Sequence, residues 1–317
     1  MKFYTKKTKD MSDKDKQSIV TLFNEVFSKK RTLEEFHDQF ELNELGYSYF
    51  GIMEDDLGNI VGSYAVMPIN YRYFGKEFIF GQSVDTMIKK EFRGNAFNLR
   101  KIANSVYNSL IEDKIPFVFG FPNNQIYLIR KKLLKWKDIG TLDTYISPLY
   151  LGKFSILSPI NTIFLKILSL FNSLLNQIFF IKNKKKYLII KNTFSGNEKY
   201  RNNNYSNTIK LNDNTLIHYF NYHYKKFNIS FFIDLELLNI RNFNEAINTI
   251  SQNEKKSNII IYMGKLNFRP LKMVRLPKFI KNKNMRLCGK ILIPELIDQE
   301  IFNEKNWQLN LSNTDLT

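Results

Sequence analysis

The sequence is poor in the residues that build disulfides and metal centres. It contains one cysteine, Cys288, and three histidines in 317 residues. One cysteine excludes a disulfide framework within the chain. No cluster of histidine, cysteine and carboxylate residues has metal-site spacing, so we expect no metal. Residues 1–7 lack the apolar core of a signal peptide, which predicts a cytoplasmic protein.

Acidic residues are also scarce. The chain has 30 Asp+Glu against 47 Lys+Arg, a formal net charge of +17. This excess favours an anionic partner, which could be nucleic acid, a membrane surface or a phosphorylated small molecule. The basic residues are spread over short runs such as 184–186 and form no known DNA- or RNA-binding signature. We therefore expect no nucleic-acid partner.

Apolar material, in contrast, is plentiful, at 44% hydrophobic and 15% aromatic residues. The length allows two domains of ordinary size. Periodicity over residues 1–150 predicts a first α/β (α+β) domain, with a mixed sheet and helices on both faces. The predicted strands are 1–8, 47–54, 60–73, 78–89, 116–121 and a closing strand at 139–150. The predicted helices are 13–28, 32–43, 96–113 and 123–135.

Residues 151–209 are expected to form a linker that contains one long, largely apolar helix at 156–181. Polar residues recur along this helix, so it is not a convincing transmembrane span. A membrane-surface anchor is one interpretation, because lysines follow the helix and residues 156–186 could contact a bilayer peripherally. The favoured interpretation is a helix packed between two domains, since buried helices commonly have one polar stripe. Residues 194–209 are expected to be a loop.

Residues 210–317 predict a second, smaller α/β domain. Its expected elements are the helices 213–226 and 241–252, the strands 228–235 and 258–263, and strand-like runs near 271–276 and 290–294. This region has no turn rich in arginine and glycine. We therefore do not expect it to bind a second phosphate-bearing donor.

The most informative segment is residues 80–100. An apolar strand pattern there runs into the small-residue turn 93–96, and a helix pattern follows. Such a turn directs backbone N–H groups out of a helix N-terminus, where they can bind a phosphate. An ordinary strand-to-helix turn, with Asn95 as the helix N-cap, is the alternative.

Residues 58–140 resemble the GNAT N-acyltransferase superfamily. Three features carry the resemblance in order: the strand pair 58–73 and 78–89, the segment Glu91-Phe92-Arg93-Gly94-Asn95-Ala96-Phe97, and Phe119-Gly120-Phe121-Pro122-Asn123 before a helix. The order of the chain and its segment 306–315 further resemble a subgroup with two GNAT-like domains, here joined by the long helix, the second one degenerate. Members of this subgroup acylate nucleotide-linked amino sugars for surface polysaccharides such as the O-antigen of lipopolysaccharide.

The resemblance implies that acyl-CoA is the donor, either acetyl-CoA or 3-hydroxybutanoyl-CoA. It implies a phosphate-binding turn at 93–98, in which Ala96 and Asn98 occupy the small-residue positions. Asn98 tolerates a left-handed backbone better than most residues. The implied donor-binding residues are Val84, Thr86, Met87, Ile88, Arg93, Gly94, Asn95, Ala96, Phe97, Asn98 and Asn123.

Two residues are candidates for catalysis. Amine acylation needs a neutral amine, and Asp85 could accept its proton; a salt bridge is the alternative role. Many relatives have a tyrosine near position 131 that protonates the leaving thiolate. Tyr127 lies one helical turn earlier and could replace it, unless it is a plain core residue. The candidate acceptor-binding residues are Gln82, Ser83, Asn124 and His223.

The remaining candidates have weaker grounds. His37 and His223 could each act as a base, although surface or packing roles are more common. Cys288 is most simply a buried small residue. Two other functions stay open: a non-catalytic GNAT-like module that binds an anionic ligand or a membrane, and an aminoacyl-tRNA-dependent transferase. The sequence does not determine the oligomeric state.

Overall fold

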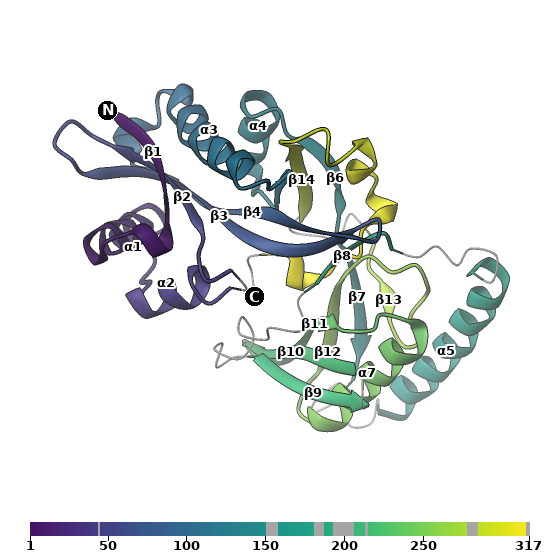
Figure 1. Cartoon of the computed structure of the whole chain (residues 1–317). Coiled ribbons are helices and arrows are strands. Elements are labelled where there is room, and N and C mark those ends of the chain that lie inside the picture. The colour runs from purple at the N-terminus through teal and green to yellow at the C-terminus, as the bar shows by residue number, and fades with distance from the viewer. Residues whose placement is uncertain are drawn as a thin grey trace. The chain divides into compact units, whose positions relative to one another are not determined.

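The computed structural model describes residues 1–43, 45–149, 158–180, 187–192, 206–212, 215–277 and 285–314. The chain divides into two compact units (Figure 1). Unit 1 comprises the described parts of Met1–Gly140, Leu188–Asn202 and Met285–Asn306. Unit 2 comprises those of Thr141–Tyr187, Asn203–Asn284 and Trp307–Thr317. Both units combine helices with a mixed sheet, which confirms the predicted mixed α/β fold.

Unit 1 is built on an eight-stranded sheet whose main path runs β1-β2-β3-β4-β5-β14-β6, with β8 paired to β3. Its strands are β1 Lys2–Lys7, β2 Tyr49–Glu54, β3 Ile60–Tyr73, β4 Lys76–Ile88, β5 Phe117–Gly120, β6 Lys137–Thr141, β8 Ile189–Lys191 and β14 Arg286–Ile291. Strands β1 to β4 pair antiparallel, and β4 pairs parallel with β5. This change of direction requires the crossover helix between β4 and β5.

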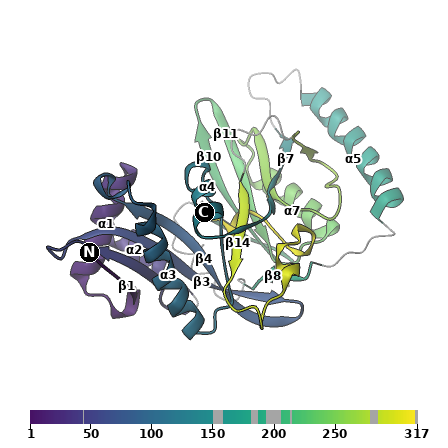
Figure 2. The same ribbon diagram turned by 90° about the horizontal axis from the view of Figure 1, so that it is seen from above.

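Four helices cover the two faces of this sheet (Figures 1 and 2). They are α1 Asp13–Phe27, α2 Leu33–Phe40, α3 Ala96–Glu112 and α4 Asn124–Leu133. Ser12 and Thr32 close capping boxes at the starts of α1 and α2. Helices α1 and α2 bury one cluster of apolar side chains on one face, and α3 and α4 pack over the other. Strand β4 is therefore covered on both sides.

Unit 2 has a six-stranded sheet in the order β13-β7-β12-β11-β10-β9. Its strands are β7 Asp143–Pro148, β9 Ser206–Asn212, β10 Thr215–Tyr224, β11 Phe227–Leu235, β12 Ile259–Gly264 and β13 Val274–Arg275. Its helices are α5 Ser158–Phe180 and α7 Ile240–Asn253, and α7 contributes to the buried core. Short 3-10 turns occur at Thr8–Asp10, Lys90–Phe92, Gln299–Phe302, Glu304–Asn306 and Leu311–Asn313.

The predicted helix at 213–226 is wrong. This segment forms strand β10, which pairs with β11 through a two-residue turn at Lys225 and Lys226. Lys225 adopts a left-handed backbone with φ of 55°. Aromatic and β-branched residues favour a strand, but the turn lacks the usual Asn-Gly pair that identifies such a hairpin. Of the predicted loop at 194–209, residues 206–209 belong to strand β9 instead, and the rest lies outside the described residues.

The compact units do not follow the predicted contiguous ranges 1–150, 151–209 and 210–317. The closing strand expected at 139–150 is two strands, β6 in the first sheet and β7 in the second. Strand β14, expected near 290–294 in the second domain, pairs with β5 of unit 1. Strand pairing with residues far away in the sequence thus decides to which unit these segments belong. Local periodicity does not contain this information.

None of the described helices is long and apolar enough to cross a membrane. Within the same residues, no group of three or more His, Cys, Asp or Glu side chains could hold a metal ion.

Candidate functional site

Along one edge, strand β4 continues beyond the end of β5, and this part of the edge has no partner strand among the described residues. The β4–β5 ladder comprises Gly81 with Val118 and Gln82 with Phe119. Strand β5 ends at Gly120, whereas β4 continues to Ile88. Among the described strands, none other than β5 pairs with this edge. Backbone groups between Ser83 and Ile88 therefore face a position that an extended ligand can occupy.

A β-bulge at Asp85 sets which side chains face which helices. Ala65 pairs with Val84 and Tyr64 with Thr86, so Asp85 is an extra residue on β4. Its φ of 39° lies in the left-handed region, where a non-glycine residue is strained. The extra residue reverses the normal alternation. Val84 and Met87 consequently both enter the core beneath α1 and α2.

On the opposite face, the same bulge brings Ser83 and Thr86 together. Both hydroxyl oxygens accept hydrogen bonds from Nη2 of Arg130 on α4, at 2.9 and 3.1 Å. Arg130 is 97% buried, since its relative exposure is 3%. Its guanidinium lies 4.6 Å from the ring centroid of Trp136. The structure thus places a full positive charge beside the unpaired edge of β4.

This buried charge has no negative partner in the described part of the chain. No described carboxylate lies within ion-pair distance of Arg130. Its Nε and Nη1 atoms are buried without a hydrogen-bond acceptor. A Cβ at Gly120 would come within 2.8 Å of Nη1, so only glycine leaves this room. A buried cation without a counter-ion is costly unless a ligand supplies the negative charge.

Local sequence patterns do not identify Arg130. It lies one residue before position 131, where many relatives have a tyrosine that this chain lacks, and three after Tyr127. Residues three apart on a helix project in similar directions, but nothing in the local sequence identifies a buried arginine. Only the pairing of α4 with the bulged strand reveals it.

Asp85 itself is bound to an arginine on the other side of β4. Its Oδ2 accepts from Nη1 of Arg31 at 2.6 Å, and the two side chains are 13% and 11% exposed. Arg31 also donates to Gln39 and lies 3.4 Å from the ring centroid of Phe23. The salt bridge named as the alternative for Asp85 is therefore present.

The turn after β4 is ordered by three side chains. Nε of Arg93 donates to the Ile88 carbonyl at 2.7 Å, and Nδ2 of Asn98 donates to the Phe92 carbonyl at 3.2 Å. Asn95 caps helix α3 by accepting from the Phe97 N–H, as the structural alternative predicted. Arg93, Gly94, Asn95 and Phe97 are exposed. The helix start is thus accessible to an anion.

Gly94 has no conformational need to be glycine. Its φ is not positive, and a Cβ there would meet no atom within 4 Å. The absence of a side chain matters at this position only if a ligand approaches the backbone closely.

Tyr127 points to strand β6 instead of the β4 edge. Its hydroxyl donates to Asp138 at 2.9 Å, and Lys131 pairs with the same carboxylate at 2.6 Å. Asn123 caps helix α4 by accepting from two backbone N–H groups of its first turn. Asn124 is exposed beside it. The hydrogen bonds described for Asn123 and Tyr127 go to other partners, whereas Arg130 bonds to Ser83 and Thr86.

The other predicted residues occupy different environments. Gln82 is buried on β4. His223 is exposed in unit 2 and lies 2.7 Å from the Asn228 side chain. His37 pairs with Glu41 on α2 at 2.6 Å. Cys288 is fully buried, which confirms its packing role, and burial raises the pKa of its thiol to about 12.

A basic pocket of about 340 Å³ lies in unit 1, formed by α3, the end of α4 and β14. Its lining residues are Arg100, Asn104, Lys132, Leu133, Leu134, Lys135 and Lys290. Half-burial lowers the pKa of Lys290, and Arg100 adds to this effect by charge repulsion. Four cations around one cavity favour an anionic ligand such as a phosphate group.

Comparison with known proteins agrees with this geometry. Residues 7–131 match the family model described as the acetyltransferase (GNAT) domain. This range contains β4, the turn 93–98 and Arg130. No curated protein matches the chain.

Solved structures share the fold. A GCN5-related N-acetyltransferase from Anabaena variabilis ATCC 29413 is 14% identical with a TM-score of 0.60, over 91% of this chain and 73% of that chain. A conserved protein from Enterococcus faecalis V583, described as a probable N-acyltransferase, is 11% identical with a TM-score of 0.57, over 92% and 73%. A GCN5-related N-acetyltransferase from Kribbella flavida is 10% identical with a TM-score of 0.58, over 91% and 71%. The match of residues 7–131 to the acetyltransferase (GNAT) domain thus supports an acyl-transferring enzyme, and the solved structures show the same fold.

Proposed function

We propose that the enzyme transfers the acyl group of an acyl-CoA to the amino group of a nucleotide-linked amino sugar. The observation that supports the transfer step is the buried, uncompensated guanidinium of Arg130 beside the unpaired edge of β4. In this proposal the donor lies along that edge, and N–H groups of β4 bind its thioester carbonyl.

The amine nitrogen attacks the carbonyl carbon, a C–N bond forms and the C–S bond breaks. Negative charge develops first on the carbonyl oxygen and then on the sulfur. Arg130 is fixed by Ser83 and Thr86, so it can stabilise this charge without reorganising. Arg130 is better placed for this role than Tyr127, whose hydroxyl is bound to Asp138.

Asp85 is our proposed acceptor for the proton that the amine loses. The pairing with Arg31 fixes the orientation of the carboxylate. Transfer through water to a more distant base is compatible with this arrangement.

The phosphate groups of the donor have two sets of partners in this proposal. The turn 93–98 offers the exposed start of α3, with Arg93 beside it. The basic pocket offers four further cations to a phosphate. Support for the sugar acceptor comes from the resemblance of the chain to sugar N-acyltransferases and from its net charge of +17.

A thiol-release assay tests the proposal. The protein is incubated with acetyl-CoA or 3-hydroxybutanoyl-CoA and a panel of dTDP-linked 3-amino-3,6-dideoxyhexoses. We expect thiol release with at least one pair and an amide product by mass spectrometry. No release with any nucleotide-linked amino sugar would reject this acceptor class.

Binding of the donor is tested separately by calorimetry with CoA. Arg93→Glu is expected to weaken binding at least tenfold, which corresponds to about 1.4 kcal/mol. Lys101→Glu is the matched control, since it makes the same charge change on α3 beside Phe3. Equal affinities for the two variants would remove the turn from the donor site.

A non-catalytic module remains the second candidate, favoured by the engagement of both predicted catalytic side chains with charged partners. It predicts no thiol release with any amine, and vesicle binding without CoA binding would favour it. An aminoacyl-tRNA-dependent transferase predicts tRNA binding and no requirement for CoA.

A further inference from the structure

Helix α5 of unit 2 is amphipathic, and its polar side faces the protein. Nδ2 of Asn161 donates to the carbonyl of Leu149 at 3.1 Å, and Nδ2 of Asn172 donates to that of Pro270 at 3.0 Å. Asn176 makes a reciprocal pair with the backbone of Arg269, at 2.8 and 2.9 Å. Asn161 and Asn172 are buried. Hydrogen bonds from these amide side chains thus hold α5 against the neighbouring segments of unit 2.

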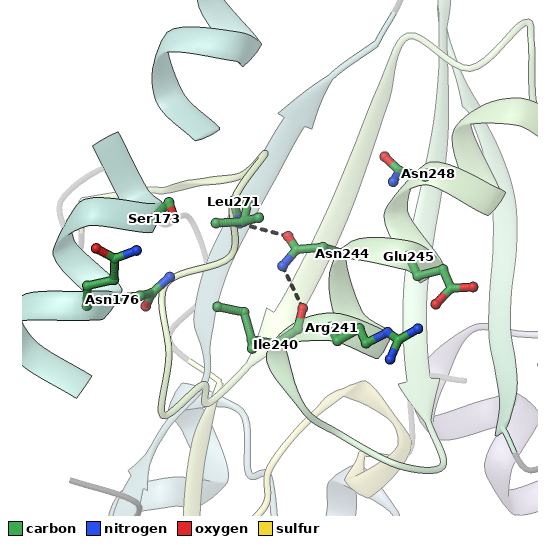
Figure 3. A pocket seen from close by; sticks show the side chains of 9 residues that line it. Ser173, Asn176, Ile240, Arg241, Asn244, Glu245, Asn248 and Leu271 are labelled. Carbon is green, nitrogen blue, oxygen red and sulfur yellow. Dashed lines mark hydrogen bonds between the residues drawn. The ribbon is translucent and has the colours of Figure 1, made fainter. Parts of the chain in front are cut away.

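A pocket lies next to this contact, and most of the residues that line it have polar side chains. It has a volume of about 540 Å³ and lies between α5 and α7. Figure 3 shows Ser173 of α5 opposite Leu271 and α7, with Asn244 bonded to Leu271. Rotating α5 would break the hydrogen bonds of all three asparagines to backbone carbonyls beside the helix. The orientation of α5 is therefore specified.

A continuous apolar arc runs along the outward side of α5. Eight large side chains on it are between 44% and 69% exposed. They are Ile160, Ile163, Phe164, Ile167, Leu170, Phe171, Leu174 and Ile178. At 100° per residue they span an arc of about 120° that contains no polar residue. A contiguous exposed surface of this kind marks an interaction site.

We propose that this face of α5 binds the surface of a lipid bilayer that contains anionic lipids. The helix lies in the plane of the membrane, with its eight apolar side chains among the acyl chains and its asparagines on unit 2. This orientation follows from the contacts of α5 with unit 2, because they leave only the apolar side of the helix free to contact a membrane.

Two features favour lipid over a protein partner. The arc is wider than the seam of an a/d coiled coil, which covers two positions in seven. It also offers no hydrogen-bonding or charged group, whereas protein interfaces combine apolar cores with polar rims. Acyl chains require no directional partner.

The charge around α5 favours anionic headgroups. The helix sequence contains no Asp or Glu, and Lys166 lies beside the apolar arc. In the sequence, Lys182, Lys184, Lys185 and Lys186 follow directly after the helix. Basic residues near an anionic surface strengthen binding to it. This combination of an apolar face and flanking cations is typical of interfacial helices.

Co-sedimentation of the full chain with vesicles tests the proposal, independently of catalysis. We expect binding to phosphatidylcholine vesicles that contain 25% phosphatidylglycerol, and weaker binding to pure phosphatidylcholine. The double variant Ile167→Asp, Leu170→Asp should lower the partition coefficient at least thirtyfold. The control Leu57→Asp, Leu237→Asp changes exposed leucines elsewhere in the same way and should bind like the wild type.

A second measurement locates the contact. Phe171→Trp introduces a reporter on the arc, and the natural Trp136 and Trp307 are 2% and 0% exposed. We expect a blue shift of the added emission when anionic vesicles are mixed in, and none for Leu57→Trp. Absence of vesicle binding by the wild type would overturn the proposal. So would a lipid-independent dimer that the Asp variant dissociates, because a second copy would then cover the face.

Discussion

The two faces of strand β4 each carry an arginine, and the two arginines differ in what neutralises them. On the side of α1 and α2, Arg31 is paired with Asp85 inside the protein. On the side of α3 and α4, Arg130 has hydroxyl and aromatic neighbours and no described carboxylate. A paired charge supports the fold, whereas an unpaired one is retained at a cost and suits a role in ligand binding.

The largest expected effect comes from breaking the internal pair. Arg31→Met leaves the carboxylate of Asp85 mostly buried without its cation, which should lower the free energy of unfolding by about 3 kcal/mol. Urea denaturation measures this loss. The double variant Arg31→Met, Asp85→Leu should recover much of it, and no recovery would mean that the pair is not what stabilises this region.

The matched change on the other face should affect the reaction more than the fold. Arg130→Met removes the cation that we assign to the developing negative charge, so kcat/KM should fall about 100-fold, or about 2.7 kcal/mol. The free energy of unfolding should change by less than about 1 kcal/mol, because no buried anion is left behind. Full activity in this variant would show that Arg130 does not act in the reaction, so the proposed difference in role between the two arginines would be wrong.

The exclusion of water from the side of the sheet that carries Arg130 can be measured through Cys288. Burial raises the pKa of this thiol to about 12. The unfolded thiol titrates near 8.5, so the folded state holds a proton that the unfolded state loses above this pH. The resulting stability is present below about pH 8.5 and disappears as pH rises toward 12.

Between pH 8 and pH 10, the wild type should therefore lose about 2 kcal/mol more stability than Cys288→Ala. The tyrosines titrate in both proteins and cancel in the difference. Equal losses would show that solvent reaches this side of the sheet.

The smallest expected effect on stability is at the turn after β4. Gly94→Ala should change the free energy of unfolding by less than about 0.5 kcal/mol, since the site has open space and no positive φ. If the backbone contacts the donor, the same variant weakens CoA binding. Unchanged affinity would show that Gly94 does not contact the donor. The proposed donor site would then depend on Arg130.

Local patterns predicted most elements of unit 1 correctly, because its helices have clear caps and its strands alternate. The helix expected at 213–226 is wrong because the aromatic residues there fit the spacing of a helix as well as that of a strand. The Lys225-Lys226 turn also lacks the sequence that identifies a hairpin. The strand at 139–150 failed because the chain leaves one sheet for another at residues 141–143. Such a transition depends on partners far away in sequence.

By itself, the sequence determined the mixed α/β class, the strand-turn-helix at residues 78–112 and the resemblance to GNAT acyltransferases, since these rest on local spacing. Only the tertiary structure decided the roles of the charges. The bulge at Asp85 turns its carboxylate to Arg31 and brings Ser83 and Thr86 to Arg130. It also decided that α5 presents its apolar side outward. Both outcomes depend on which polar groups find partners, and apart from Leu149, the partner of Asn161, those partners lie between 44 and 98 residues away in the sequence.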